Sequence, residues 1–319
     1  MRALSHAILA PNPHNRQPWL VELKGDDTVI LLRDETRDLP ETDPYNRQIF
    51  IGLGCFLEQL TIAASADGYA LATTLFPEGE TGPVAIAKFT QGGTADPLAQ
   101  HILTRHCDKG PYSDHPIPAT AVTALSSFAT IITEPTKVAN IQSLSWDAFK
   151  VETFTPRTLK ESVDLMRAGK REINANPDGI ELQGALFDLG RISDFITNDL
   201  LMDTNHPTFQ GVLDEYDTTL HATPAYAVIN TDGNTRTDQI TAGRQWLRLQ
   251  LTATANGLGM QPISQALQEY PEMADLYAKA HQMLARDGQT VQMLGRLGYG
   301  TSAIKTPRWP LETRIINET

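Results

Sequence analysis

The chain of 319 residues contains little cysteine and no recognisable metal motif. Its two cysteines, Cys55 and Cys107, are too few for a disulfide framework, and the eight histidines form no H-x-x-x-H pair that could hold zinc. No apolar run approaches the roughly 20 residues of a membrane helix, and the opening MRALSHAILA lacks a signal-peptide cleavage site. We therefore expect a cytoplasmic protein with reduced thiols and no membrane partner.

Three common nucleotide and nucleophile motifs are also missing. The sequence contains no G-x-G-x-x-G, no G-x-x-x-x-G-K-[ST] and no G-x-S-x-G, which disfavours a Rossmann site, a P-loop and a nucleophile elbow. The formal net charge of -12 argues against binding to nucleic acid, although it leaves room for a local basic pocket that holds one phosphate.

Helical and strand-like segments interleave without the regular rhythm of a doubly wound sheet, so we expect an α+β fold with helices around antiparallel or mixed sheets. The loosest stretch, KFTQGGTADP at residues 88–97, predicts a boundary between a part at 1–97 and a part at 98–319. The predicted strands are Asp27–Asp34, Pro83–Phe89 and Ala225–Thr231, and the predicted helices include Ala95–His106, Pro156–Ile173 and Glu272–Ala285.

Two segments of the chain resemble each other. GLGCFLEQLTIAASADGYAL begins at Gly52 and TAGRQWLRLQLTATANGLGM begins at Thr241, and aligning Gly54 with Gly243 places Gly68 on Gly257. Both predict apolar helices that end at a glycine. The shared spacing favours an internal duplication over the alternative that any two buried helices look alike.

Basic residues gather in two places in this acidic chain. TRHCDKGPY at Thr104–Tyr112 and IKTPRWPLETR at Ile304–Arg314 could each supply guanidinium groups to a phosphate. The alternatives are a solvated helix end for the first cluster and a surface tail for the second.

APNPHNRQPW, at Ala10–Trp19, is dense in hydrogen-bonding side chains and is stiffened by three prolines. This composition predicts a binding loop.

Together these pieces resemble the nitroreductase family of FMN oxidoreductases. RHCDKGPY is similar to that family's phosphate motif, and APNPHNRQPW to its N-x-Q-P-W loop. AGRQWLRLQLTATANGLGMQPI resembles its long helix and the loop that follows over the flavin, and RLGYG with TPRWPLE resembles its closing strand and basic turn.

The order of the motifs resembles the Acg-like branch, in which two nitroreductase subdomains are fused in one chain. The first part keeps the N-x-Q-P-W loop and the second keeps the phosphate motif, so the resemblance implies an intrachain pseudo-dimer with one composite flavin site. Such a chain could be a monomer or could form a homodimer.

The resemblance also implies roles on the phosphate side of FMN. Arg105, Arg308 and Lys305 would hold the phosphate, and His106 and Cys107 belong to the same motif. Cys107 stands where the family has serine, which removes a good hydroxyl donor.

On the ring side, Lys109 would lie near the N1/C2 edge of the flavin, where a cation stabilises the reduced form. The other contacts implied by the resemblance are Asn12, Pro13 and Asn15 at the ring edge, Asn15 and Gln17 fixing the loop, and Gln261, Pro262 and Ile263 over the ring near N5.

An insertion at about residues 171–216, containing REINANPDGIELQG, is predicted to be a lid, with a packed helical insertion remote from the site as the alternative. The expected activity is hydride transfer through flavin N5 to a nitro, quinone or similar small-molecule acceptor, with NAD(P)H as a possible donor. One alternative is a protein that sequesters FMN under its lid with little NAD(P)H turnover, and another is a degenerate structural protein.

Overall fold

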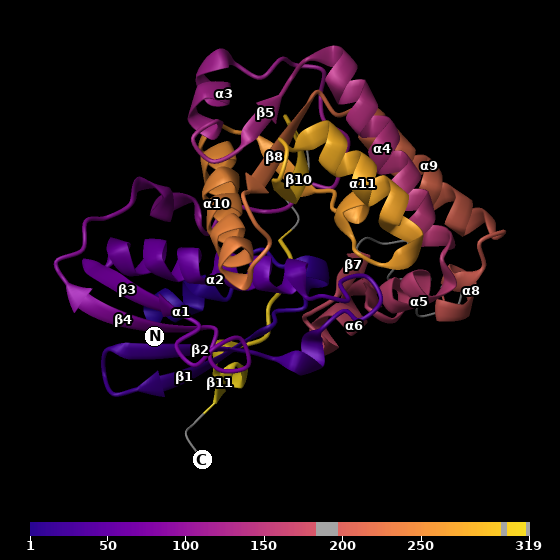
Figure 1. Cartoon of the computed structure of the whole chain (residues 1–319). Coiled ribbons are helices and arrows are strands. Elements are labelled where there is room, and N and C mark those ends of the chain that lie inside the picture. Colours follow the sequence, from indigo (N-terminus) through magenta and orange to yellow (C-terminus); the bar gives the residue numbers. More distant parts are fainter. Residues whose placement is uncertain (183–196, 301–304, 317–319) are drawn as a thin grey trace.

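The computed structural model describes residues 1–182, 197–300 and 305–316. It has the expected α+β fold, with helices packed around antiparallel and mixed sheets (Figure 1).

The first sheet is built from the N-terminal part of the chain and one strand from the other end. Its strand order is β11-β1-β2-β4-β3, antiparallel throughout except that β11 lies parallel to β1. The C-terminal end of the chain therefore completes the N-terminal sheet. The strands span β1 Trp19–Lys24, β2 Thr28–Arg33, β3 Tyr69–Leu75, β4 Ala85–Gln91 and β11 Ile315–Ile316.

The second sheet repeats this topology. Its order is β5-β8-β10-β9, all antiparallel, and a long helix joins its second and third strands in sequence just as one does in the first sheet. The elements are β5 Thr130–Ile132, β8 Ala225–Thr231, β9 Gly259–Pro262, β10 Thr290–Gly298, and the two joining helices α2 Arg47–Ala66 and α10 Arg236–Ala255.

The helices α2 and α10 cross where the two aligned glycines lie. A Cβ built on Gly54 would overlap the carbonyl oxygen of Ile240, and one on Gly243 would overlap that of Ile51. The contacts are reciprocal, because Ile51 stands to Gly54 as Ile240 stands to Gly243. Only glycine allows this approach, and the reciprocity supports the predicted duplication.

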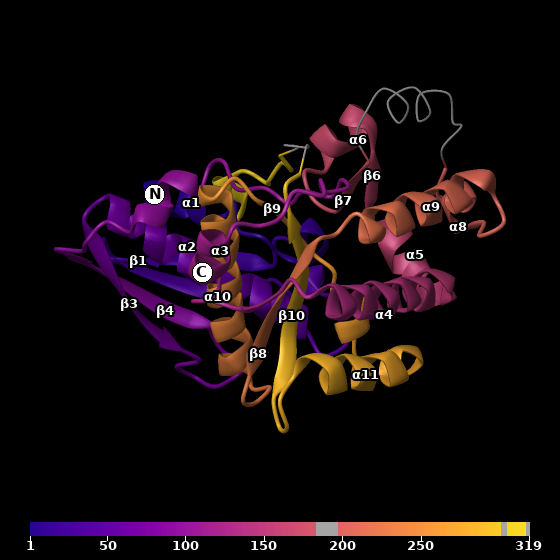
Figure 2. The same ribbon diagram turned by 90° about the horizontal axis from the view of Figure 1, so that it is seen from above.

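The molecule is layered from the first sheet, through α2 and α10, to the second sheet and an outer group of helices (Figure 2). Strand β8 shows why both faces of the second sheet are covered. Ala225, Ala227 and Ile229 belong to the core shared with α2 and α10, whereas Tyr226 and Val228 face a separate core under the outer helices. The alternation is that of a strand buried on both sides.

The outer helices and the insertion lie together beside the second sheet (Figures 1 and 2). The short parallel pair β6–β7 belongs to this region, and residues 183–196 of the predicted insertion lie outside the described residues. The remaining elements are α1 Arg2–Ala7, α3 Ala119–Leu125, α4 Pro135–Phe154, α5 Pro156–Asp164, β6 Met166–Ala168, α6 Gly169–Ala175, β7 Ile180–Leu182, α8 Asn198–Met202, α9 Pro207–His221 and α11 Ala274–Leu284.

All three predicted strands are confirmed, and the helix predicted at Glu272–Ala285 is confirmed as α11. The helix predicted at Ala95–His106 is wrong: only a short 3-10 turn at Pro97–His101 forms. Arg105 bonds to Gln250 and to the carbonyl oxygen of Leu9, so tertiary contacts draw this segment out of a helix.

The single helix predicted over Pro156–Ile173 is also wrong. The chain forms α5, then the strand β6, then α6, and Gly169 between them has φ +77°, which no continuous right-handed helix accommodates. Pairing of β6 with β7 outweighs the helical propensity of the segment.

Helix α2 contradicts the expectation that no apolar run approaches the length of a membrane helix. By length and composition it could cross a membrane, but 83% of its apolar window is buried inside the molecule. Its hydropathy is that of a core helix enclosed by neighbours.

Candidate functional site

The binding loop predicted at Ala10–Trp19 has a strained backbone. Pro13–Asn15 form a 3-10 turn, and three non-glycine residues have left-handed φ values: His14 at 47°, Asn15 at 50° and Gln17 at 52°. Conformations of this kind cost free energy and persist only where surrounding contacts enforce them.

Hydrogen bonds from distant segments supply that enforcement. The Gln17 side chain donates to the carbonyl oxygen of Pro177 at 2.8 Å and accepts from the backbone N–H of Trp309 at 2.9 Å. The Asn15 side chain donates to the carbonyl oxygen of Pro307 at 3.2 Å. The loop is thus held by the C-terminal segment and by the insertion.

The loop forms one wall of a cavity of about 490 Å³. Gly52 of α2 allows the loop to pack against this helix, since a Cβ at this position would lie only 3.0 Å from the Cβ of Asn12. Eleven of the predicted site residues line this cavity: Asn12, Pro13, Asn15, Arg105, His106, Cys107, Lys109, Gln261, Pro262, Lys305 and Arg308.

Two predicted residues do not line it. Gln17 is fully buried beneath the loop, and Ile263 is buried in the core under the outer helices. Gln17 acts on the loop through the hydrogen bonds given above. Ile263 follows directly after β9, and its side chain packs into that core rather than into the cavity.

One end of the cavity, here called the arginine end, carries the guanidinium groups of buried Arg105 and half-buried Arg308. Arg105 donates to the Gln250 side chain and to the carbonyl oxygen of Leu9, and its Nε has no partner within the described residues. Arg308 donates to backbone carbonyl oxygens at residues 8–10. Within 1–182, 197–300 and 305–316, no carboxylate forms a salt bridge with either group.

Burial and the charge of Arg105 lower the pKa of Arg308 to about 9, and the charge of Glu181 partly opposes this. Burial also lowers the pKa of Arg105. Two like charges that lie close together away from water are costly unless an anion joins them. This end of the cavity is therefore suited to an anion such as a phosphate monoester.

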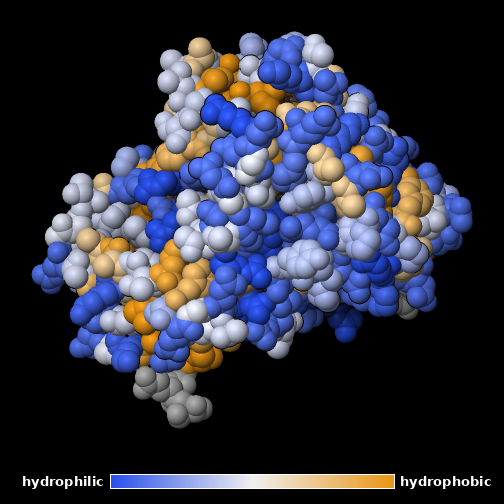
Figure 3. Space-filling model, viewed as in Figure 1, coloured by the Kyte–Doolittle hydropathy of each residue, from blue (hydrophilic) through white to orange (hydrophobic). Residues whose placement is uncertain are grey.

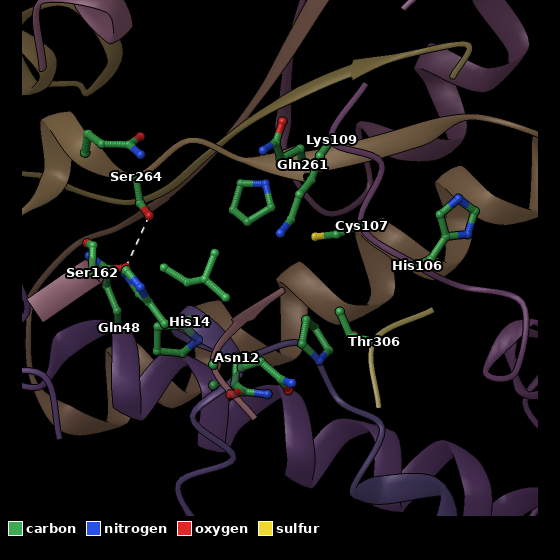
Figure 4. A pocket seen from close by; sticks show the side chains of 18 of the residues that line it. Asn12, His14, Gln48, His106, Cys107, Lys109, Ser162, Gln261, Ser264 and Thr306 are labelled. Atoms are coloured by element: carbon green, nitrogen blue, oxygen red, sulfur yellow. Dashed lines mark hydrogen bonds between the residues drawn. The ribbon is translucent and has the colours of Figure 1, made fainter. Parts of the chain in front are cut away.

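The segment after Arg105 is positioned by Arg296, which sequence analysis missed. This buried guanidinium donates to the carbonyl oxygens of Asp108 at 3.1 Å and Gly110 at 2.6 Å, and to the Gln261 side chain at 2.6 Å. It thereby sets Lys109 and Gln261 side by side above the cavity (Figure 4). Nothing in the sequence around Arg296 distinguishes it from a surface arginine.

His14 was also missed, although it lies within the predicted loop. It lines the cavity opposite Lys109 (Figure 4), and burial, with the charges of Lys109 and Arg16, lowers its pKa to about 4. The ring is therefore neutral at physiological pH, and its Nδ1 has no partner within the described residues.

The described part of the insertion lines the same cavity through Gly179, Ile180, Leu201, Phe209 and Val212. The described part of the insertion therefore borders the candidate cavity, and its role as a lid stays a prediction. Asp178 anchors it, accepting hydrogen bonds from Arg37, Arg167 and the indole of Trp309.

No protein-family model matches the chain. It is 24% identical over 130 residues to two proteins named "Putative NAD(P)H nitroreductase" from the CDC 1551 and H37Rv strains of Mycobacterium tuberculosis. The matched region is 40% of this chain and 38% of each relative.

Among solved structures, the FMN-dependent nitroreductase NfnB from Mycobacterium smegmatis, in complex with NADPH, has a TM-score of 0.41 and 16% identity, covering 68% of this chain and 96% of that one. A nitroreductase with bound FMN from Bacteroides fragilis has a TM-score of 0.40 and 11% identity, with 68% and 96% covered. Assignment to the Acg-like branch stays a prediction. Over the matched 40% of its length, the chain is thus similar in sequence to two proteins named as nitroreductases.

Proposed function

We propose that the chain is an FMN-dependent oxidoreductase that passes reducing equivalents to a small-molecule acceptor such as a nitro compound or a quinone. The observation that carries this proposal is the arginine end of the cavity, where buried Arg105 and half-buried Arg308 lie without a salt-bridged carboxylate in the described chain. Bound FMN supplies hydride chemistry at its N5 atom, so the protein needs no catalytic acid or base of its own.

The residues that line the cavity fit such a cofactor. The two guanidinium groups and exposed Lys305 would neutralise a phosphate, and Lys109 would stabilise negative charge on a reduced ring. The stiff loop at Asn12–Asn15 would hold the ring edge at little further cost in conformational entropy, because other contacts already fix its backbone.

One composite site per chain follows because different segments of the chain supply the loop and the cations. The loop comes from residues 10–19, whereas the cations come from residues 105–109 and 305–308. We propose that a single chain binds one FMN, and that the two repeated halves each provide what the other lacks.

A second function is favoured by one specific observation, the presence of the insertion in the cavity wall. Residues from α8 and α9 and from the turn at 179–180 line the space beside the loop. A flavin enclosed in this way would be shielded from a bulky nicotinamide donor, and the protein would then hold FMN with little turnover.

The first test is the flavin content of the purified chain. We expect absorbance near ~450 nm from an oxidised flavin at one equivalent per chain. Two equivalents would contradict the composite site, and a colourless protein that cannot be reconstituted would contradict the proposal as a whole.

The second test removes the anion-binding groups. Arg105→Ala with Arg308→Ala should weaken FMN binding by at least about 100-fold, since each charge-assisted hydrogen bond contributes about 1.5–3 kcal/mol. The paired lysine variant keeps both charges but loses the guanidinium fork, so its affinity should fall in between. Arg2→Ala, at an exposed salt bridge with Asp67, is the control that should bind normally. Unchanged affinity in a folded double alanine variant would place the phosphate elsewhere.

Anaerobic addition of NADH or NADPH separates the two functions. Fast bleaching of the flavin supports the oxidoreductase, whereas bleaching by dithionite but not by either nicotinamide supports the sequestering protein.

A further inference from the structure

The cavity continues away from the arginine end, between α4, α5 and α9. Its lining there includes Phe149, Glu152, Ser162, Phe209, Gln265 and Gln268. In Figure 4, Ser162 and Ser264 lie on one side of the cavity and His106 and Cys107 on the other. We call this second region the Glu152 compartment. The six lining residues named here include no cation, in contrast to the arginine end.

Glu152 is the unusual residue of this compartment. Its side chain is only 8% exposed, and its Oε2 has no hydrogen-bond partner within the described residues. Gln268, 4% exposed, likewise has an unpartnered side-chain oxygen in the described chain. Buried oxygens without donors are rare in folded proteins because each one has lost its water, and here both belong to the wall of a cavity.

The charge of Glu152 responds to pH near neutrality. Burial raises its pKa to about 7 and the charge of Glu161 raises it further, whereas the nearby polar side chains of Gln268, Gln265 and Ser162 lower it. The other titratable groups that face it are the phenols of Tyr216 and Tyr270, whose own pKa values burial raises, so both stay neutral.

Charged groups on the neighbouring elements are paired elsewhere. Arg157 of α5 lies over the outer face of the Tyr270 ring and forms salt bridges with Glu41 and Glu272. Lys160 of the same helix pairs with Asp164 at the surface. No cation from α5 therefore neutralises the Glu152 carboxylate.

Aromatic side chains give the compartment a flat apolar wall. Phe149 stacks on Tyr216 with ring centroids 3.7 Å apart and planes inclined by 15°, and Phe209 is buried in the adjoining cluster. A planar ring of a ligand could pack on these side chains in an offset arrangement.

We propose that the Glu152 compartment binds the aromatic group of a ligand that bears a neutral or cationic N–H donor, with Glu152 and Gln268 accepting its hydrogen bonds. The compartment accordingly selects cationic over neutral aromatics when Glu152 is ionised. If the proposed function holds, this ligand is the reaction partner of the flavin. Only that role of the ligand rests on the proposed function; its binding in the compartment does not.

Benzamidine and benzamide are suitable probes, because they share one shape and differ in charge. Their affinities for the full chain as purified can be measured by ligand-observed NMR titration between pH 6 and 8, with flavin content recorded for each sample. We expect benzamidine to bind about 5–10 times more tightly at pH 8 than at pH 6, as Glu152 loses its proton. Benzamide should change by less than about twofold.

Glu152→Gln keeps the shape and removes the charge. It should abolish the pH dependence of benzamidine binding and weaken it at pH 8 by about tenfold or more, which is the size expected for a lost charged hydrogen bond. Asp147→Asn is the matched control, since this exposed carboxylate on the same helix pairs only with Lys150 among the described residues. It should behave like the parent chain.

Benzamidine affinity that is independent of pH, or equal in the parent and a folded Glu152→Gln variant, would overturn the inference. Absence of binding by both probes would also overturn it. These outcomes are separate from failure of the proposed function, which the flavin content of the same samples reports directly.

Discussion

The two sheets share one topology but differ in what covers them. The two central strands of the second sheet, β8 and β10, are buried on both faces, with β10 buried at every position from Val291 to Gly298. In the first sheet, β3 is exposed or half-exposed along its whole length. Hydrophobic residues also lie at the surface over the region of β1, β2 and β11 (Figure 3). One half of the repeat thus carries an additional helical layer that the other lacks.

That additional layer is where the two halves diverge in chemistry. Helices α4, α5 and α9 pack beyond the second sheet and supply the Glu152 compartment. The first half has no counterpart to them within the described chain and contributes the strained loop instead. A repeated scaffold can therefore support an asymmetric site when one copy is elaborated and the other keeps a single loop.

The largest effect is expected at the contact that joins the halves. Gly54→Ala places a methyl group that overlaps the carbonyl oxygen of Ile240. This contact lies at the α2–α10 crossing, where both helices are buried. Overpacking of this kind costs about 1–3 kcal/mol or more, and here it pushes on backbone rather than on a side chain. We expect Gly54→Ala to lower the free energy of unfolding by at least about 3 kcal/mol, measured by chemical denaturation.

Gly211→Ala is the matched control for that substitution. Gly211 lies in helix α9 and a Cβ there meets nothing within 4 Å, so alanine should stabilise the helix by about 0.5–1 kcal/mol. If Gly54→Ala were as well tolerated as the control, the crossing would not be the rigid centre of the molecule.

Sequence reasoning identified the two segments that meet at this crossing, because they share their glycine spacing. Gly54 and Gly243 occupy equivalent places in two similar segments, and glycine in a buried helix has few explanations other than close approach. The APNPHNRQPW loop and the arginine cluster were likewise visible, since three prolines fall within ten residues of the loop and clustered cations stand out in an acidic chain.

Other parts of the site depend on tertiary contacts, and no pattern in the sequence indicates them. Arg296 lies in an apolar strand and acts by bonding carbonyl oxygens, which no local pattern encodes. Glu152 matters because α5 and α9 bury it, and its neighbours in sequence do not reveal that. The break between α5 and α6 depends on pairing with β7, which lies beyond the break.

A smaller effect is expected where the insertion ties the halves together. Asp178 is 7% exposed and accepts from Arg37 at 3.1 Å, from Arg167 at 3.0 Å and from the Trp309 indole at 3.0 Å. Asp178→Asn would leave two guanidinium groups without this carboxylate, so we expect a loss of about 1–3 kcal/mol in unfolding free energy.

The contribution of Asp178 to stability depends on pH. Hydrogen bonding by Trp309 and the charges of Arg167 and Arg37 lower the pKa of Asp178 below its ordinary value of 3.8, against the effect of burial. Its contribution is therefore present above pH 3.8 and lost as the pH falls through the lower folded-state pKa. The variant should be less stable than the parent at pH 7 and approach it near pH 2–3. Asp164→Asn, at an exposed pair with Lys160, should change stability by less than about 0.5 kcal/mol.

The smallest effect is expected at Cys107, where the second half departs from the motif it resembles. Cys107 lines the arginine end beside Arg105, and a thiol is a weak donor to an anion. Cys107→Ser places a hydroxyl donor in nearly the same volume, so FMN affinity, followed by quenching of flavin fluorescence, should rise about two- to tenfold. Cys107→Ala tests whether the donor is responsible, since it keeps the small size and offers no hydrogen bond. Equal affinities for the serine and alanine variants would mean that position 107 makes no contact with the phosphate, and that the second half binds it through its guanidinium groups alone.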